Sequence, residues 1–349
     1  MKINNNSSYI FLLIKVPISL ILIILFFEFI AFCLSDYRAI RHGLDRKVSN
    51  LENNISIYNS NTLLFGDSVT KDIADDFYIS ADCCNLLNFT TNRASGFLGS
   101  YLLYKKYREN NKAPEYIIIS STPNFLNFFP EDETKKLYLT SVFDTKEENK
   151  IISSYYKISA NKKLNYSPLS WVKQKYGFTI FNLENKVVYP LVNAFGFINT
   201  RTALSFGKKT IPDIEIINDL REKVVINNNQ ELNNENSNLI ITPQVNKLME
   251  DFFTLLQNDG TSVFIAWAPL RKSYYDIIKN NNELVQLEKY LQIKSKKNNV
   301  NLYLHDFSAE GVFSDIAFRD QDHLKEGYWK IYYAYLLNKF INSIYSKAN

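Results

Sequence analysis

The stretch Asn61-Thr-Leu-Leu-Phe-Gly-Asp-Ser-Val-Thr70 decides how the chain is interpreted, because a short apolar run ends in a Gly-Asp-Ser turn. Residues 62–65 are typical of a buried strand, and a small turn after such a strand can present the Ser68 hydroxyl at the edge of a sheet. Near the other end of the chain, Asp320-Gln-Asp-His323 can bring an imidazole and a carboxylate to that hydroxyl. A Ser-His-Asp set activates serine, since imidazole takes the hydroxyl proton while the carboxylate holds the ring in one tautomer.

Strands and helices alternate on both sides of this stretch. Continuous apolar runs predict strands at 62–65, 85–89, 115–120 and 262–267, and a fifth strand ends the helix–strand pair at 283–305. Helices are predicted after Ser68, up to about residue 109, at 243–258, in the first part of 283–305 and at 325–345. This alternation of apolar strands with helices predicts a parallel sheet that helices cover on both faces.

The alternation stops between residues 124 and 238. This stretch contains an aromatic helical fragment at 168–176, a predicted strand at 186–190 and an Asn/Glu-rich tract at 227–238 that is typical of a solvated loop. We expect 124–238 to be an insertion that leaves the carboxyl end of the third strand, where open α/β sheets bind ligands. Its aromatic residues either stack on sugar rings or pack a small core of the insertion: Tyr155, Tyr156, Trp171, Tyr176 and Tyr189.

The N-terminal region predicts a membrane anchor. Residues 9–34 are almost wholly apolar, and the 19 residues from Val16 to Leu34 are near the length of about 20 residues that a spanning helix needs. A cleaved signal peptide would have an apolar core of about 7–15 residues followed by a small-residue cleavage site, and no such site follows. We therefore expect an uncleaved anchor at 1–35, a stalk at 36–60 and a folded domain at 61–349. Basic residues flank the apolar segment on both sides, so charge gives no orientation.

The stalk prediction depends on a helical spacing of apolar residues: Leu44, Val48, Leu51 and Ile55.

Composition argues against several classes of protein. The net charge is only +4, and no basic block alternates with aromatic residues, so we expect no nucleic-acid partner. The chain has three cysteines and three histidines, with no spacing that suits a structural zinc site. Cys83 and Cys84 are adjacent and cannot easily meet disulfide geometry, so we interpret them as small residues of a buried strand.

Four sequence blocks, taken in order, resemble the SGNH/GDSL hydrolase superfamily. They are Gly66-Asp67-Ser68 after the first strand, Gly96 after the second, Asn124 after the third and Asp320-x-x-His323 before the last helix. The first and last blocks are the specific ones. The resemblance implies a flavodoxin-like three-layer α/β/α domain with a parallel sheet.

The resemblance also implies a role for each block. Ser68 would be the nucleophile, His323 its base and Asp320 the carboxylate that orients the base. The backbone N–H groups of Ser68 and Gly96 and the side-chain amide of Asn124 would form the oxyanion hole, as donors to the charge that develops on a tetrahedral intermediate.

Several of these assignments have alternatives. Asp322 is a second candidate partner for the imidazole, and both acids could instead cap the following helix. Gly99 competes with Gly96. Asn124 lacks the usual Gly-x-Asn-Asp context, because Pro123 precedes it.

Two aromatic motifs at strand ends are also open. Trp267-Ala-Pro269 lines an acceptor pocket or simply packs in the core, and His305-Asp306 is expected to form a turn rather than a second site.

The anchor, the incomplete third block and the insertion together resemble one subgroup of the superfamily. These are membrane-tethered SGNH proteins that accompany membrane-bound O-acyltransferases in modifying bacterial cell-surface polymers, as in teichoic-acid D-alanylation or alginate acetylation. The resemblance implies an extracytoplasmic domain, an acyl-Ser68 intermediate, transfer to a sugar hydroxyl, and no metal or organic cofactor. Two other functions remain open: an extracytoplasmic carbohydrate esterase or deacetylase, and a non-catalytic glycan-binding assembly protein of the same fold.

Overall fold

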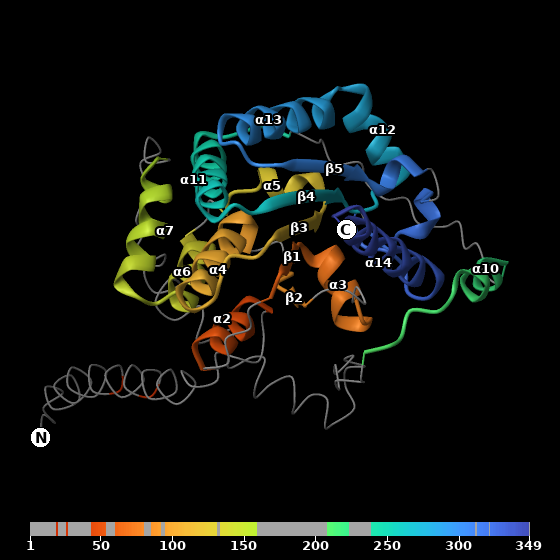
Figure 1. Ribbon diagram of the computed structural model, residues 1–349, viewed down its shortest axis with the longest axis horizontal. Helices are drawn as coiled ribbons and strands as arrows, with labels where there is room; N and C mark the ends of the chain where they lie inside the picture. The colour runs from red at the N-terminus through yellow and green to blue at the C-terminus, as the bar shows by residue number, and fades with distance from the viewer. Residues whose placement is uncertain are drawn as a thin grey trace, which may run out of the picture. The chain divides into compact units, whose positions relative to one another are not determined.

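A five-stranded parallel sheet lies at the centre of the structure (Figure 1). The structure is a computed structural model. It describes residues 43–53, 60–79, 85–91, 95–130, 133–158, 208–222, 239–310, 313–320 and 322–348, together with Ser19 and Phe26. All of these except Ser19 and Phe26 belong to one unit, formed by residues 42–163 and 204–349.

The predicted strands are confirmed, and so is their parallel arrangement. They are β1 (Thr62–Gly66), β2 (Leu86–Asn88), β3 (Tyr116–Ser121), β4 (Ser262–Trp267) and β5 (Leu302–Asp306), in the order β2-β1-β3-β4-β5. The middle of β3 is buried on both sides, which explains why its sequence is a continuous run of isoleucines rather than an alternating pattern.

Helices cover both faces of the sheet, each over its own apolar cluster (Figure 1). The first face carries α4 (Gly96–Asn110), α11 (Pro243–Asp259), α12 (Lys272–Asn280) and α13 (Glu283–Lys297). The second face carries α3 (Ser68–Asp76) and the long α14 (Tyr328–Ala348), and α10 (Ile214–Glu222) packs against α14. Two short 3₁₀ helices, Phe307–Glu310 and Asp315–Ala317, lie between β5 and α14.

Helix α2 (Gly43–Asn53) occupies the region predicted as a stalk. The predicted helix is confirmed, and Leu44, Val48 and Leu51 are buried in the same cluster as α4. The buried ammonium of Lys106 on α4 also pairs with Glu52 at 3.0 Å. Because α2 contributes to this core, it is part of the folded domain.

Most of the described part of the predicted insertion is helical. It consists of α5 (Pro123–Asn127), α6 (Glu133–Val142), α7 (Lys146–Ile158) and α10. Tyr155 on α7 is 2% exposed and donates a hydrogen bond to Asp251. Of the two predicted roles, core packing is therefore confirmed for this residue, and stacking on a sugar is wrong. The fragments predicted at 168–176, 186–190 and 227–238 lie outside the described residues.

Within the described ranges, no helix has both the length and the apolar character needed to cross a membrane. Apart from Ser19 and Phe26, the segment 9–34 lies outside these ranges, so the anchor stays a prediction.

Candidate active site

The turn that carries Ser68 follows β1 directly. Gly66 lies so close to β3 that an added Cβ would be 2.2 Å from the carbonyl oxygen of Ser120, so only glycine fits. Asp67 is the N-cap of α3, and its carboxylate accepts a hydrogen bond from the Val69 N–H at 3.1 Å. Ser68 is therefore the first residue of α3, at the carboxyl edge of the sheet.

The carboxylate of Asp67 also connects the turn after β1 to the turn after β3. Asp67 is 1% exposed, and its second oxygen accepts hydrogen bonds from the Thr122 N–H at 2.9 Å and the Thr122 hydroxyl at 2.7 Å. Burial raises the pKa of this carboxyl, and the hydrogen bonds from Thr122 and Val69 act in the opposite direction. The segment that leads to Asn124 is thus tied to the segment that carries Ser68.

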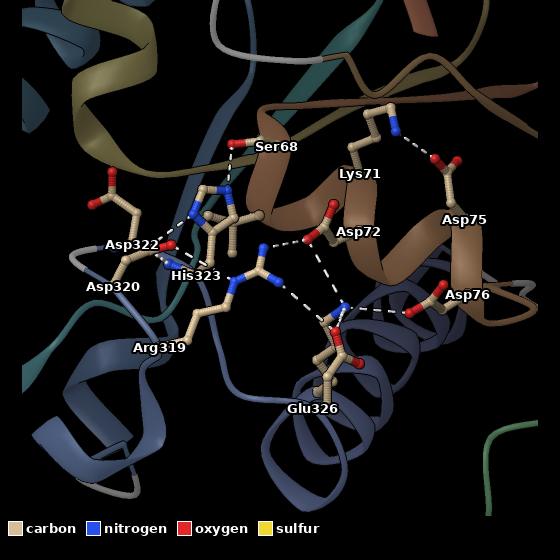
Figure 2. A network of polar contacts seen from close by, with 12 residues as sticks. Ser68, Lys71, Asp72, Asp75, Asp76, Arg319, Asp320, Asp322, His323 and Glu326 are labelled. Carbon is tan, nitrogen blue, oxygen red and sulfur yellow. Dashed lines mark hydrogen bonds and ion pairs between the residues drawn. The ribbon is translucent and has the colours of Figure 1, made fainter. Parts of the chain in front are cut away.

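The structure brings Ser68, His323 and Asp320 together in one chain of contacts (Figure 2). The Nε2 atom of His323 lies 2.9 Å from the Ser68 Oγ, and its Nδ1 atom lies 3.0 Å from the Asp320 Oδ1. These distances are within the range for a nucleophile, its base and an orienting carboxylate. Asp320, rather than the alternative Asp322, holds the imidazole.

The loop around Asp320 is organised by the same oxygen that contacts the imidazole. Oδ1 accepts hydrogen bonds from the backbone N–H groups of Asp322 at 3.0 Å and His323 at 2.8 Å, while the Arg319 N–H donates to the His323 carbonyl at 2.9 Å. Partial burial raises the pKa of the Asp320 carboxyl, but the hydrogen bonds from His323 and Asp322 outweigh burial and the pKa is lowered overall. An ionised Asp320 requires Nδ1 to carry the proton, which leaves Nε2 as the acceptor for the serine hydroxyl.

A network of ion pairs joins this loop to α3 and α14 (Figure 2). Arg319 lies 3.2 Å from Asp72 on α3. Lys330 on α14 is 8% exposed at its side chain and lies 3.3 Å from Asp76 and 2.9 Å from Glu326. These residues were not predicted from the sequence, in which the Glu326–Lys330 spacing of four was the available local signal. The network places α3, which carries Ser68, and the loop that carries His323 against one another.

The Gly96 segment lies beside the Ser68 turn. The Thr91 N–H donates to the Gly66 carbonyl at 2.9 Å, and Gly96 then begins α4 with a φ of +56°. A Cβ on Gly96 would be 2.9 Å from the carbonyl oxygen of Phe128. Among the described contacts, Gly96 makes no hydrogen bond to Ser68, and its oxyanion role stays a prediction. Gly99 lies within α4, where it packs against Ser95.

Asn124 lies near the start of α5, two residues after the Asp67-bound Thr122. Its side-chain Nδ2 donates a hydrogen bond to the hydroxyl of Tyr274 on α12 at 2.8 Å. One amide N–H is thus used within the protein, so an oxyanion hole would depend on the other N–H of the same group. The sequence analysis did not predict Tyr274, which is buried and 150 positions away.

The side chains of the motifs at the ends of β4 and β5 make contacts within the protein. Trp267 is fully buried and donates from its indole nitrogen to Glu288 at 2.8 Å, so packing rather than lining a pocket is its role. His305 and Asp306 belong to β5 itself, where a turn was predicted. Asp306 accepts a hydrogen bond from Tyr275 at 2.7 Å.

No group of three metal-ligating side chains occurs in the ranges that the structure describes. Cys33, Cys83 and Cys84 lie outside those ranges.

Comparison with known proteins adds no assignment. No model of a protein family matches this chain, and no curated protein is similar enough to count as a relative. The geometry of Ser68, His323 and Asp320 is therefore the basis for a proposal about function.

Proposed function

We propose that this chain is a membrane-tethered serine O-acyltransferase of the SGNH type, which modifies a bacterial cell-surface polysaccharide through an acyl-Ser68 intermediate. The observation that carries the proposal is the contact chain from Ser68 Oγ through His323 to Asp320, at 2.9 and 3.0 Å. The strand order β2-β1-β3-β4-β5 also supports it, because this is the flavodoxin-like order and Ser68 lies at the carboxyl edge where such sheets bind ligands.

The first half of the reaction forms the acyl-enzyme. His323 Nε2 takes the hydroxyl proton as Ser68 Oγ attacks the acyl carbonyl, and Asp320 stabilises the imidazolium that results. In this proposal the Ser68 backbone N–H, at the first turn of α3, would donate to the oxyanion together with the Gly96 N–H and the Asn124 amide. The imidazolium then gives its proton to the leaving group, and the acyl group stays on Ser68.

The second half transfers the acyl group. A sugar hydroxyl attacks the Ser68 ester, His323 Nε2 takes the proton of that hydroxyl, and the proton returns to Ser68 Oγ as the ester bond to serine breaks. Nucleophile and base both come from the chain, so the proposed reaction uses no metal and no organic cofactor. The predicted anchor at 9–34 would hold the domain outside the membrane, where a membrane-bound O-acyltransferase supplies the acyl group.

A fluorophosphonate probe, which reacts with activated serines, tests the site. The full chain in detergent should be labelled, while Ser68→Ala and His323→Ala should each abolish labelling, because the residues act as a unit. Ser154→Ala is the matched control, since this exposed serine bonds only within its own helix among the described contacts. Equal labelling of Ser68→Ala and the wild type would exclude Ser68 as the nucleophile.

The identity of the acceptor needs a second measurement. With an activated acetyl ester as donor, an added oligosaccharide acceptor should raise turnover and become acylated. Free acetate as the only product, whatever glycan is offered, would identify an esterase. No consumption of ester would favour the glycan-binding protein.

A further inference from the structure

A groove of about 820 Å³ lies on the second face of the sheet, beside α14 and away from Ser68. Its floor comes from three neighbouring strands, with Tyr116 on β3, Phe264 on β4, and Tyr303 and His305 on β5. Its volume is within the range of roughly 300–1,000 Å³ that is usual for small-ligand sites. Neither the triad nor the packing of the sheet accounts for an open groove at this place.

Aromatic side chains of α14 form the opposite wall. Tyr332, Tyr335 and Phe340 line the groove from the helix, and Phe340 stacks on His305 at 4.8 Å between ring centres. Tyr332 and Tyr335 also stack in sequence along α14. The wall therefore presents flat rings to the groove.

Tyr303 is the most accessible of the floor residues. Its ring stacks on Phe264 at 4.6 Å with an angle of 10° between the planes, and the residue is still 53% exposed. Phe264 is in turn supported edge-on by Tyr116 at 5.8 Å. A tyrosine whose ring is fixed from one side and open to solvent is a platform for a flat ligand, at little cost in side-chain entropy.

Apart from the His305 imidazole and the Lys339 ammonium, the polar side-chain groups of the groove are hydroxyls, and none is a carboxylate. Tyrosine hydroxyls and those of Ser262 and Ser343 surround the aromatic surfaces, and each can both donate and accept a hydrogen bond. An acyl chain would leave such groups without partners, whereas a sugar ring combines an apolar C–H face with a rim of hydroxyls. The lining thus fits a saccharide better than a lipid.

The charge of the groove selects among saccharides. Lys339 is exposed at the groove and makes no ion pair with a described residue. None of the residues that line the groove is acidic. A negative substituent on the ligand would therefore meet a positive charge without competition.

We propose that this groove binds an acidic oligosaccharide, with its rings on Tyr303 and the α14 tyrosines and its negative group near Lys339. The groove extends along the strands from Ser262, at the start of β4, to Phe307, just after β5. Six strand residues cover about 20 Å, enough for several sugar units. The saccharide assignment depends on the groove alone. The further idea that the bound saccharide continues toward Ser68 as the acyl acceptor rests on the proposed function.

The test is binding of the full chain, in detergent, to an array of acidic and neutral bacterial surface glycans. We expect binding to acidic glycans, and an affinity about tenfold lower in Tyr303→Ala, as expected for loss of one aromatic contact worth about 1.4 kcal/mol. Tyr78→Ala is the matched control, because Tyr78 is also exposed, at 57%, and does not line the groove. Lys339→Gln should weaken binding of acidic glycans, and Lys289→Gln, at an exposed position on α13, should not.

Several results would overturn the inference. They are no binding to any acidic glycan, equal effects of Tyr303→Ala and Tyr78→Ala, or equal binding of neutral and acidic glycans by wild type and Lys339→Gln. Circular dichroism of each variant would confirm that the fold is retained. Ser68→Ala should bind glycan as the wild type does. Glycan binding without fluorophosphonate labelling would refute the proposed reaction and support the glycan site in the groove. Labelling without glycan binding would support the proposed reaction and refute the glycan site.

Discussion

Replacing Asp320 by asparagine should slow acylation far less than replacing it by alanine. Where this carboxylate-to-amide change was made in a Ser-His-Asp triad, it held the imidazole in the wrong tautomer and cost about 10⁴ in rate. Here the Asp320 Oδ1 also accepts two backbone N–H groups, from Asp322 at 3.0 Å and His323 at 2.8 Å. These two donors require an oxygen at that position, so the asparagine carbonyl should take it and still accept from the imidazole Nδ1.

The rate reduction in Asp320→Asn should then come mainly from the loss of the negative charge. Charge-assisted hydrogen bonds contribute about 1.5–3 kcal/mol against about 0.5–1.5 for neutral ones, a difference of about 1–2 kcal/mol. Because the Asp320 side chain is 51% exposed, solvent screens part of this charge and the lower end applies. One to two kcal/mol corresponds to a rate reduction of about 5- to 30-fold, and we expect a value toward the fivefold end. Asp320→Ala removes the acceptor of all three donors, and its rate should fall by about 10² or more.

The measurement is the rate of fluorophosphonate labelling of wild type, Asp320→Asn and Asp320→Ala, at a pH where the wild-type rate is constant. Thermal unfolding of each variant serves as the control for loss of structure. Equal losses in the two variants, or a 10⁴-fold loss in Asp320→Asn, would refute the conclusion that the two backbone donors keep an oxygen beside the imidazole.

Three further predictions concern stability. The pKa of Asp320 is lowered in the folded state, so its stabilising contribution should be complete above the ordinary value of 3.8 and disappear as the pH falls through the lowered value. Urea unfolding of wild type and Asp320→Asn at a series of pH values measures this contribution, and a stability difference that persists at the lowest pH would contradict the prediction. Gly66→Ala should lower the free energy of unfolding by about 3 kcal/mol or more, because its Cβ would be 2.2 Å from a backbone oxygen. Gly260→Ala, with open space but a φ of +66°, should lower it by about 1–2 kcal/mol, and similar losses in the two variants would refute the close approach at Gly66 as the cause. Lys330→Ala should lower the free energy of unfolding by about 1–3 kcal/mol in the same assay, since it leaves three carboxylates without their buried cation. Lys272→Ala, in an exposed pair, should leave stability unchanged, and equal effects of the two variants would mean that the network is dispensable.

The predictable parts of the fold are those that local sequence determines. The run Ile117–Ile119 can be interpreted as a strand buried on both faces because three β-branched residues in succession suit no half-exposed position. The contact between Asp320 and His323 was predictable for a related reason, because the two residues are three positions apart and their contact is local. The pairing of His323 with Ser68 came instead from the resemblance to the SGNH/GDSL blocks.

The parts that were not predicted depend on contacts between distant residues. Arg319 meets Asp72 across 247 positions, and Asn124 meets Tyr274 across 150, and nothing in the spacing of these residues indicates either contact. Aromatic content was ambiguous for the same reason. Tyr155 and Tyr303 look alike in the sequence, yet the first is buried and the second is exposed on a groove.

The separation of Ser68 from His323 along the chain has a consequence for the nascent protein. The two residues are 255 positions apart, and β1 and β3 can pair long before the loop that carries His323 is synthesised. At about 5–20 residues per second, the ribosome needs roughly 10–50 s to make the intervening chain. During that interval Ser68 has its strand and its turn but not the His323 imidazole. If the proposed function is right, the growing polypeptide should be unreactive toward acyl donors until the loop that carries His323 has been made and has folded onto the sheet.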